Sequence, residues 1–479
     1  MRRQNVISLI LALVLTLTLG ACTTPGNGPA DSTTAAVAET GEFRVGYGKV
    51  EITPEESVPL AGFGNVEQRM STGYIDRLYT TCIAITDSQG NTMLLFASDL
   101  ASWFGSLAVT CREYVANETG IPYENILLSA SHTHSGPSTV TTSNASISRY
   151  NETLAKNMAQ AAVDALASQA AAKMHIASVE IEGLNFVRHY ELADGKKVGY
   201  ESMIPAEGAV AHAGFGDYTM QLLKFTREGE KDIVLMNWQG HPTRSSAKRY
   251  DVSADVVGQL CIQMEEKMDC YAAYFQGAAG NMNLKTEVLS EEFPQDYKDH
   301  AAAVIQQVMD ANLEFTEVFA DKVTCMTRTY TGKVNHEEDH MVDSANIVQA
   351  FWNQSNDRKE SDALAAQYGI RSVYHAGSII TRSKLAETAD LDMIVASIGD
   401  VGIVSAPYEM FAGSGLQIKE RSPFAMTFIA GYASGHQGYI PSTDAFEYEG
   451  YETDNTKFVR GTAEELVEGF VNMLEEIHG

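Results

Sequence analysis

The 479-residue sequence is poor in basic residues, and it has no long apolar run beyond one near its N-terminus. Lys and Arg number 34 against 62 Asp and Glu, which gives a formal net charge of -28. A surface this acidic repels phosphate backbones and anionic lipid heads, so nucleic acid is excluded as a partner. Without a second apolar run of about 20 residues, no further membrane span is expected. Nothing in the sequence indicates a protein partner.

The sequence also lacks the motifs of several common enzyme classes. It has no CxxC pair for a cysteine-based zinc site, no G-x-S-x-G elbow of a serine hydrolase and no P-loop. Five cysteines follow Cys22, an odd number that cannot all pair within one chain. We predict buried thiols, and a Cys261–Cys270 disulfide stays open for a chain outside the cytoplasm.

The N-terminus carries a targeting segment. Residues 6–19 form an apolar run of 14 residues behind Arg2 and Arg3, which suits a signal peptide better than a membrane-spanning helix. The run ends in Leu19-Gly20-Ala21-Cys22, which looks like a bacterial lipobox, with an ordinary secretory signal as the alternative. We predict a lipoprotein signal peptide over 1–21, lipidation of Cys22 and a flexible tether over 22–42. The protein is then expected on the extracytoplasmic side of the bacterial cell envelope, held to the membrane by its lipid.

Predicted strands and helices alternate through the rest of the chain. Apolar and alternating runs predict strands at 43–52, 78–87, 92–99, 126–130, 174–182, 218–226, 232–238, 271–275, 321–332, 391–399, 401–406 and 425–431. Helices are predicted at 104–119, 151–169, 253–268, 295–311, within 343–367, from Tyr408 and at 462–477. The fold class is therefore α/β (mixed α+β), with layered mixed β-sheets flanked by helices in a single large domain over 43–479.

Two histidines directly follow the predicted strand 126–130. The segment 131–137 reads S-H-T-H-S-G-P, and side chains two apart in an extended chain point the same way. His132 and His134 are thus expected to face one cavity, and neutral imidazole is the commonest metal ligand. The alternative is one core histidine and one surface histidine.

Three more strand ends carry polar side chains. His241 follows the strand 232–238, Glu409 follows 401–406, and Tyr439 lies in a glycine-rich loop after 425–431. Taken singly, Glu409 also fits the first turn of a helix, where the dipole favours a carboxylate, and Tyr439 fits a packed loop residue.

The segment 336–340 matches the H-E-x-x-H motif of zinc proteases. In those enzymes the motif lies on a buried helix with apolar neighbours. Here the segment is acidic throughout, which favours a solvated loop or a helix start.

Matching segments run through nearly the whole folded chain: 45–54, 59–65, 97–100, 131–137, 237–243, 407–409 and 431–450. Together they resemble the neutral/alkaline ceramidase family, in its N-terminal catalytic domain. In that family one zinc ion is held by two histidines, a glutamate and a tyrosine. By motif, the resemblance assigns these ligands to His132, His241, Glu409 and Tyr439.

The resemblance implies a zinc-dependent hydrolase that cleaves the amide bond of an N-acylated lipid, as ceramidases do in sphingolipid metabolism. Zinc would lower the pKa of water and polarise the carbonyl. In such an enzyme His134 would bind the substrate oxygen or transfer the proton, and Arg188 would stabilise the oxyanion.

One stretch departs from the family pattern. Where the family carries S-N-x-G-D-x-S-P-N, residues 276–283 read Q-G-A-A-G-N-M-N, without serine or aspartate. Two alternatives therefore stay open: a metal-dependent hydrolase of another acyl amide or ester, and a surface lipoprotein that binds a ligand without chemistry.

Overall fold

The computed structural model describes residues 41–63, 69–140, 144–199, 209–212, 216–245, 250–285, 297–448 and 450–479. The predicted signal peptide, Cys22 and nearly all of the predicted tether lie outside these residues. From Thr40 to Gly479 the chain forms one compact unit, in keeping with a single domain. Within the described ranges, no helix has both the length and the apolar character that a membrane crossing requires.

Nine of the described strands form the larger sheet. Its order is β14 (Tyr271–Gln276), β12 (Glu230–Trp238), β11 (Thr219–Arg227), β6 (Ala170–Glu180), β1 (Arg44–Glu51), β3 (Tyr79–Thr86), β4 (Thr92–Ser98) and β5 (Ile126–Ala130), with β16 (Thr316–Val318) also paired to β6. Neighbours along this path are antiparallel except for two parallel pairs, β12–β14 and β4–β5. Three of these strands, β5, β12 and β14, end in five or six consecutive buried residues, as expected where both faces of a sheet are covered.

A smaller sheet packs face to face on the larger one. It has the order β17 (Val323–Lys333), β18 (Thr388–Ile398), β19 (Val401–Ser405) and β21 (Met426–Ala430), the last two being parallel. One apolar cluster joins the two sheets, with Ile83 and Phe275 from the larger sheet and Ile403 and Phe428 from the smaller one. The interior is thus built from the inward-facing side chains of two stacked sheets.

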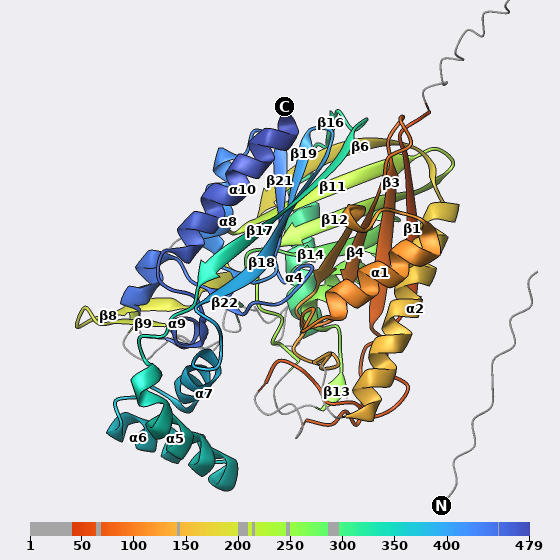
Figure 1. Ribbon diagram of the computed structural model, residues 1–479. Coiled ribbons are helices and arrows are strands. Elements are labelled where there is room, and N and C mark those ends of the chain that lie inside the picture. Colours follow the sequence, from red (N-terminus) through yellow and green to blue (C-terminus); the bar gives the residue numbers. More distant parts are fainter. Residues whose placement is uncertain are drawn as a thin grey trace, which may run out of the picture. The chain divides into compact units, whose positions relative to one another are not determined.

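Helices cover both outer faces (Figure 1). Over the larger sheet lie α1 (Leu107–Thr119) and α2 (Ala145–Ala167) at one end, and α3 (Asp255–Met268) and α4 (Tyr297–Asp310) at the other. Over the smaller sheet lie α8 (Ala412–Arg421) and α10 (Thr462–His478). The layers are therefore helix, sheet, sheet and helix, which confirms the predicted class.

The larger sheet curls so that its two ends approach each other. β5 and β14 stand at opposite ends of the strand order, yet they contact one another, and β21 contacts β14 and β12. Ser129 of β5 also forms an isolated bridge with Ala433, just after β21. The carboxyl ends of β5, β12, β14, β19 and β21 consequently meet at one place.

A small helical lobe projects away from the sheets at the lower left of Figure 1. It consists of η3 (Asp339–Met341), α5 (Val342–Ser355), α6 (Arg358–Gln367) and α7 (Val373–Arg382), which share their own apolar cluster. The remaining short elements are β2 (Gly73–Tyr74), β7 (Asn185–Val187), β8 (His189–Leu192), β9 (Lys197–Gly199), β10 (Ala209–His212), β13 (Asp251–Val252), β15 (Met282–Leu284), β20 (Glu409–Met410), β22 (Tyr439–Ile440), η2 (Tyr123–Asn125), η4 (Thr443–Glu447) and α9 (Tyr451–Asn455).

Most predicted elements are present within a few residues, with the following exceptions. The predicted helix at Tyr408 is wrong: residues 409–410 form strand β20, and the helix α8 begins only at Ala412. Helix α7 was not predicted, and α2 begins at Ala145 rather than at 151. Cys82, Cys111 and Cys270 are buried free thiols, and Cys261 and Cys325 are partly buried free thiols, so the Cys261–Cys270 disulfide is absent.

Candidate metal centre

His132 lies in a tight turn directly after β5. Its backbone is in the left-handed region, with φ of 63°, which few residues other than glycine adopt without strain. Its backbone N–H donates to the Leu100 carbonyl over 2.9 Å, which ties the turn to the end of the neighbouring strand β4. The two histidines therefore converge through a turn, and the extended chain predicted for them is wrong.

His241 follows β12 and is fixed by the loop after β14. Its backbone N–H donates to the Met282 carbonyl over 2.9 Å. Its side-chain Nδ1–H donates to the Ala279 carbonyl over 2.8 Å, so the ring orientation is set by the backbone at 277–283. The backbone of residues 277–283, which contain no serine, therefore fixes the position of His241.

Glu409 and Tyr439 are direct partners in the parallel pair β20–β22. The Glu409 N–H donates to the Gly438 carbonyl over 2.9 Å. Gly280 supports this pair from below, because a Cβ atom there would lie 2.6 Å from the Glu409 carbonyl oxygen. Both side chains are buried, with exposed fractions of 6% and 7%.

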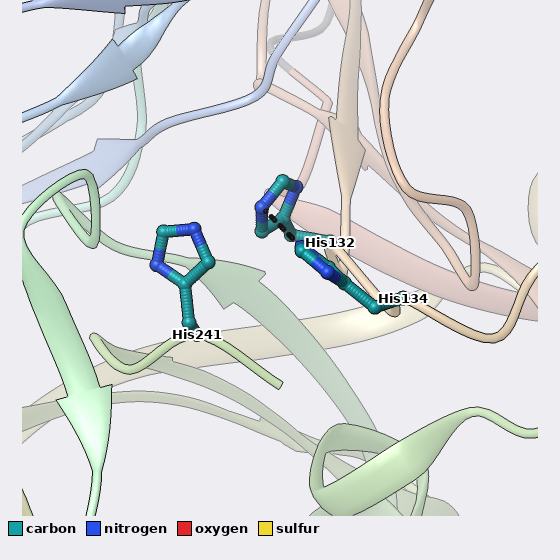
Figure 2. Close-up of side chains that lie close together, drawn as sticks. All are labelled: His132, His134 and His241. Atoms are coloured by element: carbon teal, nitrogen blue, oxygen red, sulfur yellow. Dashed lines mark hydrogen bonds between the residues drawn. The ribbon is translucent and has the colours of Figure 1, made fainter. Parts of the chain in front are cut away.

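The side chains meet around one point. His132 Nε2 lies 3.1 Å from His134 Nε2 and 3.7 Å from Glu409 Oε2, and His241 Nε2 lies 3.3 Å from the same oxygen. Tyr439 Oη lies 3.4 Å from His241 Nε2. Figure 2 shows the three histidine rings turned toward one another, and their ring nitrogens lie within 4.8 Å of each other.

The proton positions on two of these histidines indicate a cation. The Nδ1 atom of His132 lies 2.8 Å from the Ala101 carbonyl, and that of His241 faces the Ala279 carbonyl. A carbonyl oxygen can only accept, so both Nδ1 atoms carry the proton and both Nε2 atoms present lone pairs. These lone pairs face Glu409 Oε2, which is buried without a hydrogen-bond donor. A cation placed between these three electron-rich atoms would be stabilised by all of them.

The spacing fits a transition metal with nitrogen and oxygen ligands. Ligand atoms about 2.0–2.1 Å from a tetrahedral zinc ion lie about 3.3–3.4 Å apart. The observed separations of 3.3 and 3.7 Å between the histidine nitrogens and Glu409 Oε2 are close to this value. Burial and the neighbouring Arg188 charge lower the pKa of His241 to about 3, which keeps the ring in the neutral form that binds metals.

His134 differs from the other two histidines. Its Nδ1 atom is buried without a well-formed hydrogen bond, and the Gly62 carbonyl is at most a poorly aligned partner. Metal-binding histidines almost always donate from their second ring nitrogen, as His132 and His241 do here. Gly62 packs directly on the ring, since a Cβ atom at its φ of 97° would lie 2.4 Å from the His134 Cγ atom. His134 is thus held beside the centre without the support typical of a ligand.

Arg188 lies behind Tyr439 rather than in the open pocket. Its guanidinium donates to Tyr439 Oη over 3.2 Å and to the Gly280 carbonyl over 2.9 Å, and its Nε pairs with Glu452. Burial opposes ionisation of Glu452, yet the Arg188 charge and the hydrogen bond from His189 outweigh it and lower the pKa of Glu452 to about 2. These contacts favour a positioning role for Arg188 over the predicted contact with an oxyanion.

A pocket of about 440 Å³ opens onto this centre. His132, His134, Glu409 and Tyr439 line its base. Its walls carry the aromatic residues Phe63, Phe104, Trp352, Tyr374, His436 and Tyr451, and the carboxamides Gln349 and Asn353. A substrate entering here would reach the histidines directly, which is the arrangement of a binding site with a buried reactive end.

Two residues at the centre were not anticipated from the sequence. The Tyr432 ring stacks on His132 with centroids 3.8 Å apart, and Glu452 holds Arg188. Tyr432 lies in the glycine-rich loop after β21, and the glycines there indicate a turn without showing what the ring contacts. Glu452 stands among other acidic residues, so its burial could not be read from composition.

The H-E-x-x-H segment does not form a metal site. His336 Nδ1 faces Asp339 over 2.9 Å, and His340 is exposed, with its Nδ1 facing the Glu337 carbonyl over 3.1 Å. Within the described ranges, His132, His134 and His241 form a group close enough to hold a metal, and no residue of 336–340 belongs to such a group.

Comparisons with known proteins show the family and the fold. Residues 43–312 match the family described as neutral/alkaline non-lysosomal ceramidase, N-terminal. The fold is similar to a solved neutral ceramidase from Pseudomonas aeruginosa, with a TM-score of 0.70 and 17% identity over 91% of this chain and 74% of that one. It is also similar to a ceramidase complexed with C2, with a TM-score of 0.67 and 17% identity over 91% of this chain and 75% of that one.

Proposed function

This chain belongs to the neutral/alkaline non-lysosomal ceramidase family, and on that basis we propose that it is a zinc-dependent hydrolase that cleaves the amide bond of an N-acylated lipid. The observation that supports a zinc site is the position of the Glu409 carboxylate, which is buried between the Nε2 lone pairs of His132 and His241. Those three side chains would hold the ion, with Tyr439 as a weaker fourth ligand. When bound, zinc supplies Lewis acidity, which polarises a carbonyl and lowers the pKa of water.

The protein's own residues position the substrate and move the proton. The pocket admits the acyl amide with its carbonyl toward the buried base, where Tyr432 and the backbone at 277–283 fix the ligand histidines. His134 lines the same base and is placed to take a proton from water and return it to the leaving amine nitrogen. Arg188 holds the Tyr439 hydroxyl in place from behind.

A second candidate is a metal-dependent hydrolase of another acyl amide or ester. One observation favours it: residues 277–283 are committed to holding His241, Arg188 and β20, and they offer no serine or aspartate to a substrate. Such an enzyme would use the same metal centre on a different acyl group.

Metal analysis and a substrate panel test the proposed function. We expect about one zinc ion per purified chain, and hydrolysis of a fluorescent ceramide that a chelator stops and added zinc restores. A short-chain acyl amide serves as the control substrate, and its turnover with ceramide inert would favour the second candidate. A metal-free protein with unchanged folding and activity would refute the zinc centre. Bound zinc without turnover of any substrate would support the alternative of a surface lipoprotein that binds a ligand without chemistry.

We also propose that the chain is anchored to the membrane through lipidated Cys22, as the lipobox pattern indicates. Without that cysteine there is no acceptor for the lipid, because the next two residues, Thr23 and Thr24, offer no thiol in its place. We therefore expect Cys22→Ala to move the protein from the membrane fraction to the soluble fraction of the cell envelope. Persistence of Cys22→Ala in the membrane fraction after a high-salt wash would contradict the anchor.

A further inference from the structure

One wall of the pocket belongs to the helical lobe. Gln349, Trp352 and Asn353 come from α5, and Tyr374 comes from α7. The facing wall carries Phe63, Phe104 and His436, which come from three separate loops. The lobe thus adds two carboxamides and two aromatic rings to a pocket whose base holds the histidines.

The residue types of this pocket are unusual for a lipid chain. Among the described residues that line it, none is Leu, Ile, Val or Met. A long alkyl chain against this wall would take the Asn353 carboxamide and the Gln349 Oε1 atom out of water without giving them hydrogen-bond partners. Each such loss weakens binding, because a buried polar group is left without its hydrogen bond. The wall is therefore better matched to a group that offers hydroxyls as well as apolar faces.

The two carboxamides are available for such a group. Gln349 Nε2 donates to the Val373 carbonyl, which fixes its orientation and leaves Oε1 as an acceptor. The Asn353 side chain is exposed and makes no hydrogen bond within the described part of the chain. Trp352 is half-buried, and the electron-rich faces of such aromatic rings attract the polarised C–H groups of a sugar. Hydrogen-bonding side chains beside flat rings are the chemistry that recognises a hydroxylated ring.

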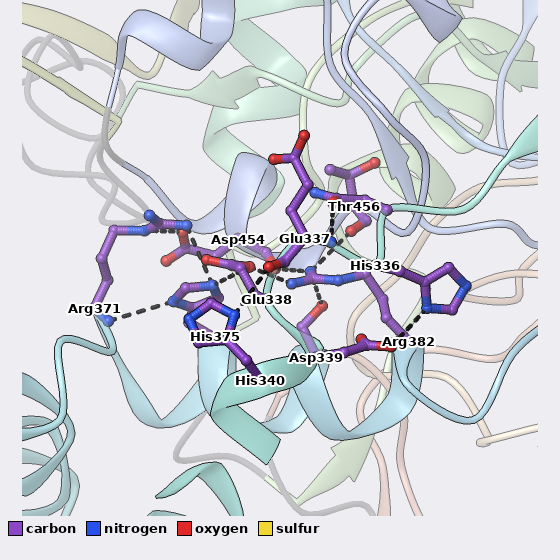
Figure 3. Close-up of polar contacts among 12 residues, drawn as sticks. His336, Glu337, Glu338, Asp339, His340, Arg371, His375, Arg382, Asp454 and Thr456 are labelled. Atoms are coloured by element: carbon purple, nitrogen blue, oxygen red, sulfur yellow. Dashed lines mark hydrogen bonds and ion pairs between the residues drawn. The ribbon is translucent and has the colours of Figure 1, made fainter. Parts of the chain in front are cut away.

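A cluster of charged side chains, of which Arg382, His375 and Asp454 are buried, ties the lobe to α9 (Figure 3). Glu338 Oε2 accepts from Arg382 of α7 and lies 2.9 Å from His375 Nε2. Arg382 also donates to the Asp454 carbonyl over 3.1 Å, and Arg371 pairs with the Asp454 carboxylate. Asp454 belongs to α9, the short helix that also carries the Arg188 partner Glu452. The wall is therefore pre-positioned over the reactive end of the pocket.

We propose that the helical lobe is the specificity element of this enzyme and that it binds the sugar ring of an N-acylated amino sugar. This inference rests on the proposed amide hydrolysis. The carbon–nitrogen bond of the amide would break, the oxygen of water would bond to the acyl carbon, and the amino sugar would leave with the proton. Such a ring can be the head of a glycolipid or part of a soluble oligosaccharide, and both present the same chemistry to Trp352 and Asn353.

Tryptophan fluorescence tests the binding step apart from catalysis. The chain has three tryptophans, of which Trp103 and Trp238 are fully buried, so a change on adding ligand reports Trp352. We use the His241→Ala variant, which cannot turn over its ligand, and a disaccharide of N-acetylglucosamine. A saturable change is expected, absent in a Trp352→Phe background. With Asn353→Ala added, half-saturation of the fluorescence change should need at least tenfold more disaccharide. The exposed neighbour Gln354→Ala is the control and should leave the half-saturating concentration unchanged.

Kinetics on three substrates complete the test. They are the disaccharide, a glycolipid with an N-acylated glucosamine head in vesicles, and an N-acyl alkylamine without a ring. Trp352→Ala should lower kcat/KM for the sugar substrates at least tenfold and change that for the alkylamine less than twofold. Turnover of only the glycolipid or only the disaccharide identifies the source of the ring.

Three outcomes separate the two proposals. No fluorescence change with the disaccharide, or an equal loss on all three substrates with Trp352→Ala, overturns the role of the lobe. Saturable binding through Trp352 with no hydrolysis of any amide supports the lobe as the ring-binding element and refutes the hydrolase.

Discussion

Replacing Glu409 by glutamine, or His241 by alanine, should strip the protein of zinc and abolish hydrolysis. Loss of an outer residue that orients a ligand costs about 10–100-fold in metal affinity, so loss of a direct ligand should cost on the order of 10³-fold or more. Glutamine keeps the shape of Glu409 but removes the negative charge that faces the two Nε2 lone pairs. Zinc content after dialysis, measured as moles per mole of chain, reports this directly.

His134→Ala gives a different expectation, because the His134 ring lacks the carbonyl support of His132 and His241. This variant should keep close to one zinc per chain and lose about 10²–10⁴-fold in kcat, the usual contribution of a positioned proton carrier. His340→Ala, on the exposed H-E-x-x-H segment, is the matched control and should keep both metal and activity. If His134→Ala loses zinc as completely as His241→Ala, the centre is a three-histidine site instead.

Sequence patterns located the parts of the centre but not their assembly. The apolar runs ending before His132 and His241 are real strands, β5 and β12, because buried parallel strands require continuous apolar residues. Nothing local shows that β5 and β14 lie at opposite ends of the strand order and still meet. That closure depends on the curl of the whole sheet, which is set by packing against the smaller sheet.

The environment of Glu409 shows why local rules failed there. The segment from Tyr408 has a helix-start composition, but its backbone pairs with residues 439–440, thirty positions later. The carbonyls of Tyr408 and Met410 accept from the backbone N–H groups of Tyr432 and Gly280, so tertiary partners satisfy groups that a helix would have used. Tertiary hydrogen bonds of this kind routinely override helix propensity. The same pairing brings Tyr439 next to Glu409, so the wrong helix and the closeness of these two predicted ligands have one origin.

Glu452→Gln should destabilise the fold by about 3–5 kcal/mol, because it leaves the buried Arg188 guanidinium without a counter-charge. Glu452 and Arg188 are 1% and 4% exposed, and Glu452 also lies 3.6 Å from His189 Nε2. The pKa of Glu452 falls from its ordinary 4.5 to about 2. A shift of that size corresponds to about 3 kcal/mol of stabilisation at neutral pH. Urea unfolding at pH 7 measures the loss.

The pH dependence follows from the sign of this shift. A carboxylate whose folded pKa is lower than its unfolded pKa stabilises the fold fully above the unfolded value, and loses that contribution as pH falls toward the folded value. The difference in unfolding free energy between wild type and Glu452→Gln should therefore be constant above about pH 5 and shrink between pH 4.5 and 2. Glu468→Gln, which breaks an exposed pair with Arg421, is the matched control and should not shift the urea midpoint measurably.

A compensating variant separates lost charge from lost packing. Arg188→Met combined with Glu452→Met removes both charges and keeps apolar volume in the site, and buried ion pairs replaced this way commonly regain stability. The double variant should recover most of the unfolding free energy lost in Glu452→Gln. Hydrolysis should stay impaired, because Tyr439 Oη loses the Arg188 donor that holds it 3.4 Å from His241. Recovery of stability and activity together would show that Arg188 does not position the metal centre.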